Sequence, residues 1–422
     1  MDRNKMILKF GITMCLMMLS ATAVAQDLSI DADDGILQRI GKMINGNGIS
    51  HGVDTNYIKI PKQPWQVSVK SRVAQTDLQM HSTIDGGAVY GPILEGTGIS
   101  LVGPLLVKPR VMTPISSSIG IKVGYRGLSA SYMLPLGGDK GRSLSLRSIG
   151  RFHSIHLRWH QFEEKSPEVP GTLNMQGLPV EAVDLMDFVP GPRDEATGIQ
   201  QFGVVGRWDL TSPIKIKTLV FDGFYIFNYK RFSYGAAYNQ KTIQKRSAGS
   251  FIAGLMAYYA DLRFDHSSNA ELITYMGGVG RIRQWQGSIG GGYAYNYVPA
   301  KGWLVGATVM PMVTFVNRMK MDRYSSDFVE QAAEDLHNLT IDEFYNSEDL
   351  NCTLTHEGTV SHNNRMAMNF TLRLSVTYNW SRYFANVNGQ FNNFQYSHKS
   401  ANNSMHGHLN DWYVNASVGV RL

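Results

Sequence analysis

The stretch that decides the fold is Asp411–Leu422, which reads D-W-Y-V-N-A-S-V-G-V-R-L. Because side chains alternate between the two faces of a β-strand, this stretch would present one apolar face and one polar or small face. A soluble protein rarely ends on such a strand, whereas an outer-membrane β-barrel needs one to close its sheet. The residues expected to face lipid are Trp412, Val414, Ala416, Val418, Val420 and Leu422. The residues expected to face the interior are Tyr413, Asn415, Ser417, Gly419 and Arg421.

The same alternation recurs along the chain from Pro64 onward. In the run 369–380, an apolar residue at every even position alternates with a polar residue at every odd position. Such runs last about ten residues, the length that a tilted strand needs to cross a bilayer. We predict an all-β fold, a transmembrane antiparallel β-barrel of about 12–14 strands. The strands are expected at 65–75, 116–125, 127–136, 142–149, 151–163, 200–210, 214–228, 231–239, 249–264, 285–297, 302–318, 363–380, 382–396 and 410–422.

Aromatic residues and connection lengths support the same fold. The chain has 20 Tyr, 18 Phe and 7 Trp without long apolar runs, and Tyr378, Trp380 and Tyr383 flank the turn at 381–382. Aromatic residues at strand ends are typical of the interfacial girdles of membrane barrels. We expect the long connections on the extracellular side and the short ones in the periplasm. The long connections are 164–199, 265–284, 319–362 and 397–409, and the short ones are 211–213, 240–248, 298–301 and 381–382.

The beginning of the chain predicts export. Arg3, Lys5 and Lys9 precede a short apolar core, and Ala23–Ala25 provides a small-x-small cleavage site. We therefore expect a signal peptide over 1–25, a periplasmic N-terminal segment with a short helix and linker over 26–63, and the barrel over 64–422. The expected location is the cell outer membrane.

Composition restricts the classes of function. Once the signal peptide is removed, Cys352 is the remaining cysteine, so no intramolecular disulfide is expected. The formal net charge of +6 does not indicate nucleic-acid binding in an exported protein. No motif indicates a cofactor. His156 and His160 would lie about 13 Å apart on one strand, too far to share a metal ion, so no metal site is expected.

Several short motifs resemble those of an uncharacterised family of exported barrels, a domain of unknown function common in Gram-negative gut anaerobes. The motifs are Asp54–Ile58 before Pro64-Trp65, Gly124–Ala130, Arg231–Tyr234, Gln244–Phe251 and Gly292–Tyr295. The resemblance covers Gly52 to Leu422. It implies an outer-membrane barrel, and it brings no known activity and no catalytic residues.

One sequence motif suggests an enzyme. His266-Ser267-Ser268-Asn269 is similar to the active-site pattern of outer-membrane phospholipases and lipid A deacylases, in which a His and a Ser two positions apart share a strand face. Such a His would accept the Ser proton and activate the hydroxyl to attack an ester. A lipid-ester hydrolase that uses His266 and Ser268 is therefore an alternative to a non-enzymatic barrel.

The predicted interior is basic, and it has two interpretations. Inward cations would attract anionic solutes into a narrow pore, or they would be structural and pair with groups inside the barrel. The acidic stretch 321–349 suggests a further alternative, surface binding through extracellular loops. The expected partners are outer-membrane lipids, lipopolysaccharide and the barrel-assembly machinery, with no nucleic acid, and the expected state is a monomer. The cations expected to face the lumen are Lys70, Arg72, Lys122, Arg126, Arg158, Lys215, Lys217, Arg373 and Arg421.

Overall fold

The computed structural model describes residues 52–84, 100–108, 110–112, 115–137, 141–177, 189–204, 207, 210–276, 278–326, 353–363, 366–399 and 403–422. The expected signal peptide and N-terminal helix, and most of the acidic stretch, lie outside these residues. The described secondary structure consists of β-strands and two short helices, α4 (Tyr234–Tyr238) and α5 (Ala270–Tyr275). No helix in the described ranges is long and apolar enough to cross a bilayer.

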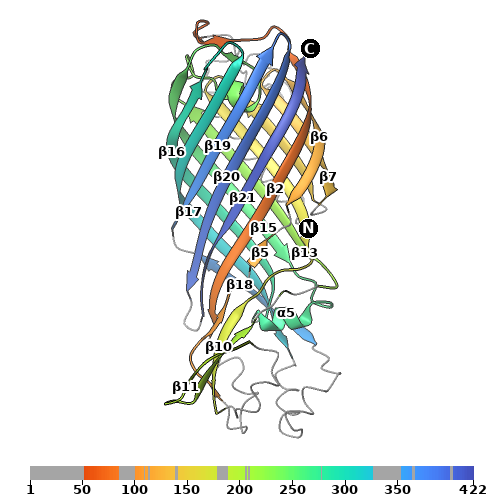
Figure 1. Cartoon of the computed structure of the whole chain (residues 1–422), viewed down its shortest axis with the longest axis vertical. Coiled ribbons are helices and arrows are strands. Elements are labelled where there is room, and N and C mark those ends of the chain that lie inside the picture. Colours follow the sequence, from red (N-terminus) through yellow and green to blue (C-terminus); the bar gives the residue numbers. More distant parts are fainter. Residues whose placement is uncertain are drawn as a thin grey trace, which may run out of the picture.

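Twelve long strands form a closed antiparallel barrel in the described part of the chain (Figure 1), as the alternation predicts. Each strand pairs with the next one given below, and the last pairs with the first. The strands are β2 (Trp65–Ile84), β6 (Ser116–Tyr125), β7 (Leu128–Gly137), β8 (Arg142–Ile149), β9 (His153–Glu164), β13 (Ile214–Ile226), β15 (Ala248–Arg263), β16 (Val279–Tyr297), β17 (Trp303–Ser326), β19 (Ala367–Trp380), β20 (Tyr383–Lys399) and β21 (Asn403–Arg421). A shorter strand, β18 (Leu354–Asn363), pairs with the far part of β17.

The C-terminal strand closes the barrel, as its sequence predicts. β21 pairs with β20 on one side and with β2 on the other, from Gln66 opposite Arg421 to Ile84 opposite Asn403. Its two faces differ as expected: Val418 is 59% exposed on the outside, whereas Arg421 is 2% exposed in the interior. Because the sheet is closed, no backbone edge is left unpaired along this seam, which a bilayer would not tolerate.

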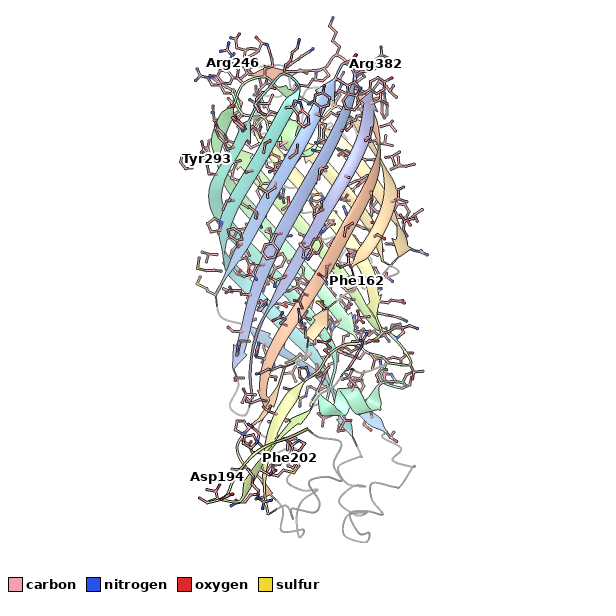
Figure 2. The ribbon with its side chains drawn as sticks, viewed as in Figure 1. Phe162, Asp194, Phe202, Arg246, Tyr293 and Arg382 are labelled. Atoms are coloured by element: carbon pink, nitrogen blue, oxygen red, sulfur yellow. The ribbon has the colours of Figure 1, made fainter. Side chains whose placement is uncertain are left out.

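The barrel has two unlike ends. At one end, which we call the turn end, short connections such as Arg126-Gly127 and Ser381-Arg382 join the strands; Figure 2 labels Arg382 there. Arg126 and Ser381 adopt positive φ values of 49° and 52°, as two-residue hairpin turns require. At the other end, the loop end, lie the longer connections and a small sheet, in the lower part of Figure 1. The chain reaches Leu422 at the turn end.

Two predicted strands are wrong. The segment 200–210 does not cross the barrel: β12 (Ile199–Val204) joins β10 (Gly171–Gln176) and β11 (Val189–Asp194) in the small sheet at the loop end. The segment 231–239 forms helix α4 instead of a strand. Its side chains are buried on every side, so its sequence lacks the polar face that distinguishes a helix from a strand.

Two predicted short connections also differ from the structure. Residues 211–213 lie at the loop end, because Ile214 at the start of β13 pairs with Glu164 at the end of β9. Residues 240–247 belong to a longer connection, 227–247, at the turn end, and Ala248 already begins β15. The predicted long connections are shortened by strand extensions, since β16 begins at Val279 and β17 continues to Ser326.

Apolar side chains fill the barrel interior near the loop end. Phe162, Ile214 and Leu262 point inward from adjacent strands and are at most 4% exposed. Val107 and Leu272 belong to the same buried cluster, and they come from β4 (Leu105–Val107) and α5. Each such side chain stabilises the fold by about 1.5–3 kcal/mol. The interior is therefore a packed core at this end. Two further short strands complete the description: β3 (Ser100–Leu101) pairs with β10, and β5 (Arg110–Met112) pairs with β2.

Candidate functional site

The connection between β13 and β15, residues 227–247, enters the barrel at the turn end, and we call it the plug. Its helix α4 is completely buried, with Tyr234 at 1% and Ala237 at 0% exposure. Ser233 caps the helix by accepting a hydrogen bond from the amide of Ala236. The plug therefore blocks the lumen at this end.

Cations of the barrel wall hold the C-terminal end of the plug helix. Arg147 donates to the carbonyl of Tyr238 at 2.8 Å, Lys122 to the carbonyl of Asn239 at 3.2 Å, and Arg421 to the carbonyl of Gln240 at 3.0 Å. These carbonyl groups lack partners within the helix, and the helix dipole makes this end negative. Part of the basic interior is thus structural, as one of the two interpretations predicts.

A segment before the first barrel strand lies across the plug. We call residues 53–64 the strap. Its strand β1 (Ile58–Lys59) pairs with β14 (Ile243–Gln244) of the plug. The guanidinium groups of Arg231 and Arg246 lie 5.3 and 5.9 Å from the ring centre of Tyr57. Three of the motifs that carry the family resemblance therefore converge on one structure at the turn end.

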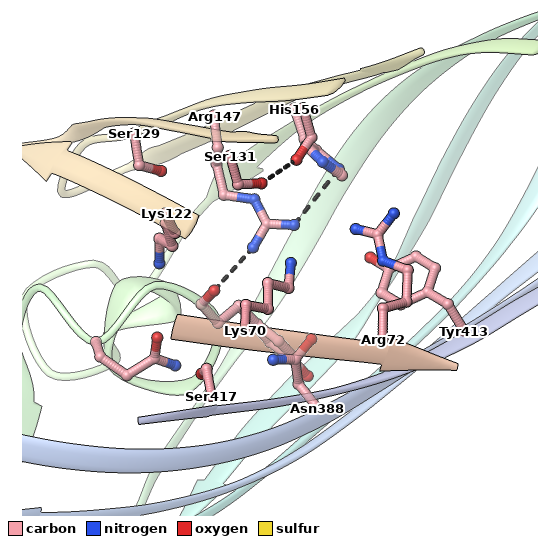
Figure 3. Close-up of a pocket in the computed structure, with 13 residues that line it drawn as sticks. Lys70, Arg72, Lys122, Ser129, Ser131, Arg147, His156, Asn388, Tyr413 and Ser417 are labelled. Carbon is pink, nitrogen blue, oxygen red and sulfur yellow. Dashed lines mark hydrogen bonds between the residues drawn. The ribbon is translucent and has the colours of Figure 1, made fainter. Parts of the chain in front are cut away.

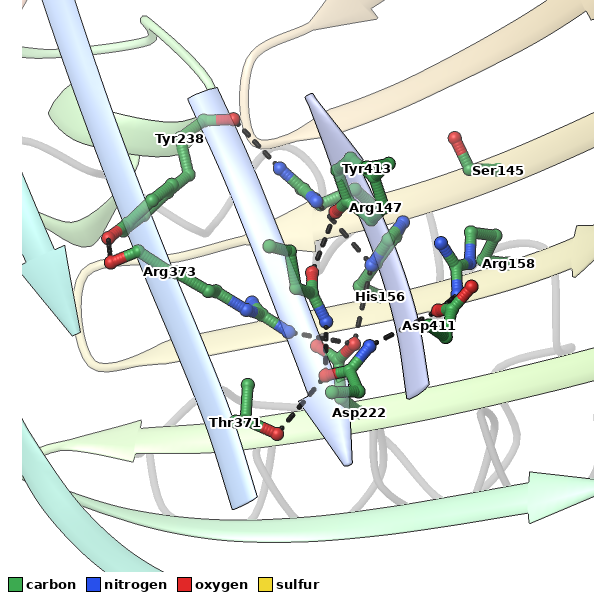
Figure 4. Close-up of polar contacts among 12 residues, drawn as sticks. Ser145, Arg147, His156, Arg158, Asp222, Tyr238, Thr371, Arg373, Asp411 and Tyr413 are labelled. Atoms are coloured by element: carbon green, nitrogen blue, oxygen red, sulfur yellow. Dashed lines mark hydrogen bonds and ion pairs between the residues drawn. The ribbon is translucent and has the colours of Figure 1, made fainter. Parts of the chain in front are cut away.

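A layer of buried ion pairs crosses the middle of the lumen (Figure 4). Arg373 Nη2 lies 3.0 Å from Asp222 Oδ1, and His156 Nδ1 lies 3.3 Å from the same oxygen. Arg158 pairs with Asp411. Neither carboxylate was predicted as an interior residue, although the alternation of buried Thr218 and Val220 on β13 places Asp222 on the inner face. The middle of the lumen is therefore internally neutralised, and it is not uniformly basic.

A small polar cavity of about 30 Å3 lies between this layer and the plug (Figure 3). Four of its lining residues are cations, and none is a carboxylate. Arg72 donates to Asn415 and Ser143 at 2.9 Å each. Lys70 projects into the cavity, and no hydrogen bond joins its Nζ to a described residue. The lining residues are Lys70, Arg72, Lys122, Ser129, Ser131, Ser145, Arg147, His156, Tyr238, Gln240, Asn388, Tyr413 and Ser417.

The nine cations expected in the lumen fall into three groups. Six point inward: Lys70, Arg72, Lys122, Arg158, Arg373 and Arg421. Arg126 lies in the turn between β6 and β7. Lys215 and Lys217 lie instead on the outer face, because they alternate with the buried Ile214, Ile216 and Thr218. Arg147 lines the cavity and holds the plug. It was not among the predicted interior cations, because the two faces of the run 142–149 were not assigned from the sequence.

His266 and Ser268 lie in a turn at the loop end and not on one face of a strand. The carboxylate of Asp265 accepts hydrogen bonds from the amide and hydroxyl of Ser267, at 3.2 and 2.7 Å, and these bonds lower its pKa. The ring of His266 lies 5.7 Å from that of Tyr324. Within the described ranges no hydrogen bond joins His266 to Ser268. No group of three or more metal-ligating side chains is found in these ranges either.

Comparison with known proteins gives one family and several distant structures. The model of a family described as Domain of unknown function (DUF4421) matches residues 210–421. No relative was found among curated proteins. The translocator domain of autotransporter NalP from Neisseria meningitidis is 9% identical, with 96% of this chain and 98% of that chain covered and a TM-score of 0.27. The outer membrane protease OmpT from Escherichia coli is 6% identical, with 85% and 97% covered and a TM-score of 0.26. The toluene transporter TodX from P. putida is 8% identical, with 86% and 91% covered and a TM-score of 0.24.

Proposed function

This chain belongs to that family of unknown function, and we propose that it is a non-enzymatic outer-membrane barrel that binds small anionic solutes in its lumen. Passage of a solute requires the plug to move. A single copy closes the barrel by pairing β2 with β21, which favours a monomer inserted by the barrel-assembly machinery. The geometry at His266 and Ser268 gives the hydrolase alternative no support, since the two side chains share no hydrogen bond in the described part of the chain.

The outer surface supports the proposed location. Large apolar side chains cover the middle of the outer face, among them Ile121 at 58% and Leu374 at 52% exposure. At the turn end, the rings of Trp303, Tyr378 and Trp380 form a continuous aromatic contact. An apolar band bordered by aromatic residues is what a barrel presents to a bilayer. Exposure of this apolar band to water would raise the free energy of the folded protein, so we place the barrel in the outer membrane.

The cavity beside the plug carries the proposal. Lys70, Arg72, Lys122 and Arg147 line it without a carboxylate, and low-dielectric protein surrounds it, so their fields add. Arg72, Lys122 and Arg147 already donate to protein groups. Lys70 has no acceptor in the described part of the chain, so its ammonium group is available to a phosphate or carboxylate. Charge-assisted hydrogen bonds to such an anion would be short and strong.

The lumen is blocked on both sides of the cavity in this conformation. The plug fills the lumen toward the turn end, and the apolar cluster fills it toward the loop end. A permanently open pore would need a continuous polar path, which these packed side chains interrupt. The function is therefore anion binding with conditional passage, and the plug is the element placed to control it.

Binding of inorganic phosphate to the intact protein in detergent tests the proposal. We expect Lys70→Gln to weaken phosphate binding on the order of tenfold, because the variant loses one charge-assisted hydrogen bond. Lys301→Gln removes a cation from an exposed turn and serves as the matched control. Absence of phosphate binding to the parent protein, or equal binding by parent and Lys70→Gln, would refute an anion site in the lumen.

A further inference from the structure

Charged side chains form two rows on the outer face of the barrel at the loop end. Strand pairing aligns Lys217, Asp261, Arg283 and Lys320 side by side across β13, β15, β16 and β17. A second row, one pleat nearer the loop end, aligns Lys215, Arg263, Arg281 and Asp322 on the same strands. The two rows hold six cations and two carboxylates. We call these eight residues the basic rows.

The residues of the basic rows face outward, as their neighbours show. On β15, Ala260 and Leu262 are buried in the interior, at 2% and 4% exposure, so Asp261 and Arg263 lie on the opposite face. On β17, a register shift opposite Gly287 changes the alternation, and Met319 and Met321 are buried inside. Their neighbours Lys320 and Asp322 therefore point outward.

The two carboxylates do not neutralise the six cations. Asp261 accepts two hydrogen bonds from Arg281, at 2.7 and 2.6 Å, and Asp322 pairs with Arg283. Lys320 lies over the ring of Trp285 at 6.0 Å. Among the described residues, no carboxylate forms an ion pair with Lys215, Lys217, Arg263 or Lys320. Because Glu163 of β9 lies opposite Lys215 in the strand pairing, the net excess on this side of the barrel wall is three positive charges, on Lys217, Arg263 and Lys320.

The basic rows begin where the apolar band ends. The next aligned row toward the turn end contains Leu219, Tyr259, Trp285 and Arg318, and the rings of Tyr259 and Trp285 lie 5.2 Å apart. Closer still to the turn end, Ile289 is 60% and Val313 is 45% exposed on the outside. Tyr and Trp residues mark the level of the membrane interface. The charges therefore lie at the level of lipid headgroups on the side of the long loops.

We propose that the basic rows bind the phosphate groups of an outer-leaflet lipid with a phosphorylated headgroup. Lys217, Arg263 and Lys320 project sideways from the wall directly beyond the aromatic row, where a headgroup lies when its acyl chains cover the apolar band, whereas Arg283 is 5% exposed and pairs with Asp322. Lys217 and Lys320 are three strand spacings apart, about 14 Å, which leaves room for two phosphates of one headgroup. Arg and Lys side chains bind phosphate by charge-assisted hydrogen bonds. The inference rests on the membrane placement proposed above and not on solute binding in the lumen.

A glycolipid titration of the full-length protein in detergent tests this site. The probes are lipopolysaccharide and the same preparation after enzymatic removal of its phosphates, with bound lipid measured by mass spectrometry. We expect Lys217→Gln/Arg263→Gln/Lys320→Gln to bind the phosphorylated probe at least tenfold more weakly than the parent protein. The parent protein should also bind the dephosphorylated probe more weakly.

A matched triple variant controls for net charge. Lys62→Gln/Lys301→Gln/Arg382→Gln removes three exposed cations from the turn end of the barrel, and it should bind the phosphorylated probe like the parent. Circular dichroism checks that both triple variants retain the β-sheet. Equal binding by parent and basic-row variant, an equal loss in both triple variants, or indifference to the phosphates would overturn the proposal. Displacement of the glycolipid by an equal concentration of inorganic phosphate would overturn the assignment to a lipid.

Discussion

Arg373 is the residue on which the polar interior depends most. Its guanidinium lies 3.0 Å from Asp222, donates to the hydroxyl of Tyr234 at 2.5 Å, and lies 4.7 Å from the ring centre of Phe224. Arg373 and Asp222 are 2% and 1% exposed. A buried charge that loses its partner keeps the full cost of desolvation. Arg373 therefore joins the barrel wall to the plug helix and neutralises Asp222.

We expect Arg373→Met to lower the free energy of unfolding by about 3–5 kcal/mol, because Asp222 is left buried without its main counter-ion. The double variant Arg373→Met/Asp222→Asn should recover much of this loss. Urea unfolding in detergent, followed by circular dichroism, measures both. Additive losses in the double variant would mean that the two side chains do not act as a pair.

Lys241 gives the plug a pH dependence. Its Nζ donates to the carbonyl of Pro64 at 2.8 Å. Burial, with a smaller effect of Arg421, lowers the pKa of its ammonium from 10.5 to about 8. A released plug would expose Lys241 to water and restore the ordinary pKa. Between these values the docked plug binds fewer protons than the released plug, so docking strengthens as the pH rises from about 8 to 10.5.

Hydrogen–deuterium exchange of residues 232–240 measures this effect when the parent protein and Lys241→Met are compared at each pH. The comparison removes the intrinsic dependence of exchange on pH. Protection of the plug in the parent, relative to the variant, should increase from pH 8 to pH 10. A constant ratio across this range would show that Lys241 does not couple plug docking to pH.

At the scale of the elements, the sequence predicts strands well and the plug poorly. The strands of the wall are recognisable because lipid and interior impose opposite polarity on alternate residues, as in β19 and β21. The plug is surrounded by the barrel wall, so Phe232, Tyr234 and Ala237 are buried on all sides and show no periodicity. Lys215 and Lys217 were assigned to the interior because polar residues of the strands were expected to face inward. Beyond the aromatic row, however, outward positions also carry cations, so polarity no longer distinguishes the two faces.

The polar interior is only partly predictable for a related reason. The strand period identifies Arg158 and Arg373 as inward, but it does not reveal which groups they meet across the lumen. Their partners, Asp411 on β21 and Asp222 on β13, come from strands that are not neighbours of β9 and β19, respectively, in the barrel. Such contacts depend on closure and strand tilt, which no local sequence pattern contains.

For the molecule as a whole, the barrel combines a lipid-facing wall with an interior closed in three layers. Apolar side chains occupy the loop end, ion pairs occupy the middle, and the plug occupies the turn end beneath the strap. The cavity lies between the ion pairs and the plug. Our central proposal is that the plug closes a lumen that selects anions.

Planar-bilayer recording tests this claim most directly. The intact protein is compared with a variant in which residues 230–248 are replaced by a two-residue Asn-Gly turn that joins β13 to β15. We expect rare openings from the intact protein and sustained currents from the variant, with a reversal potential that favours anions over cations. Equal currents from the two proteins, no current from a folded variant, or a reversal potential that favours cations would contradict the claim.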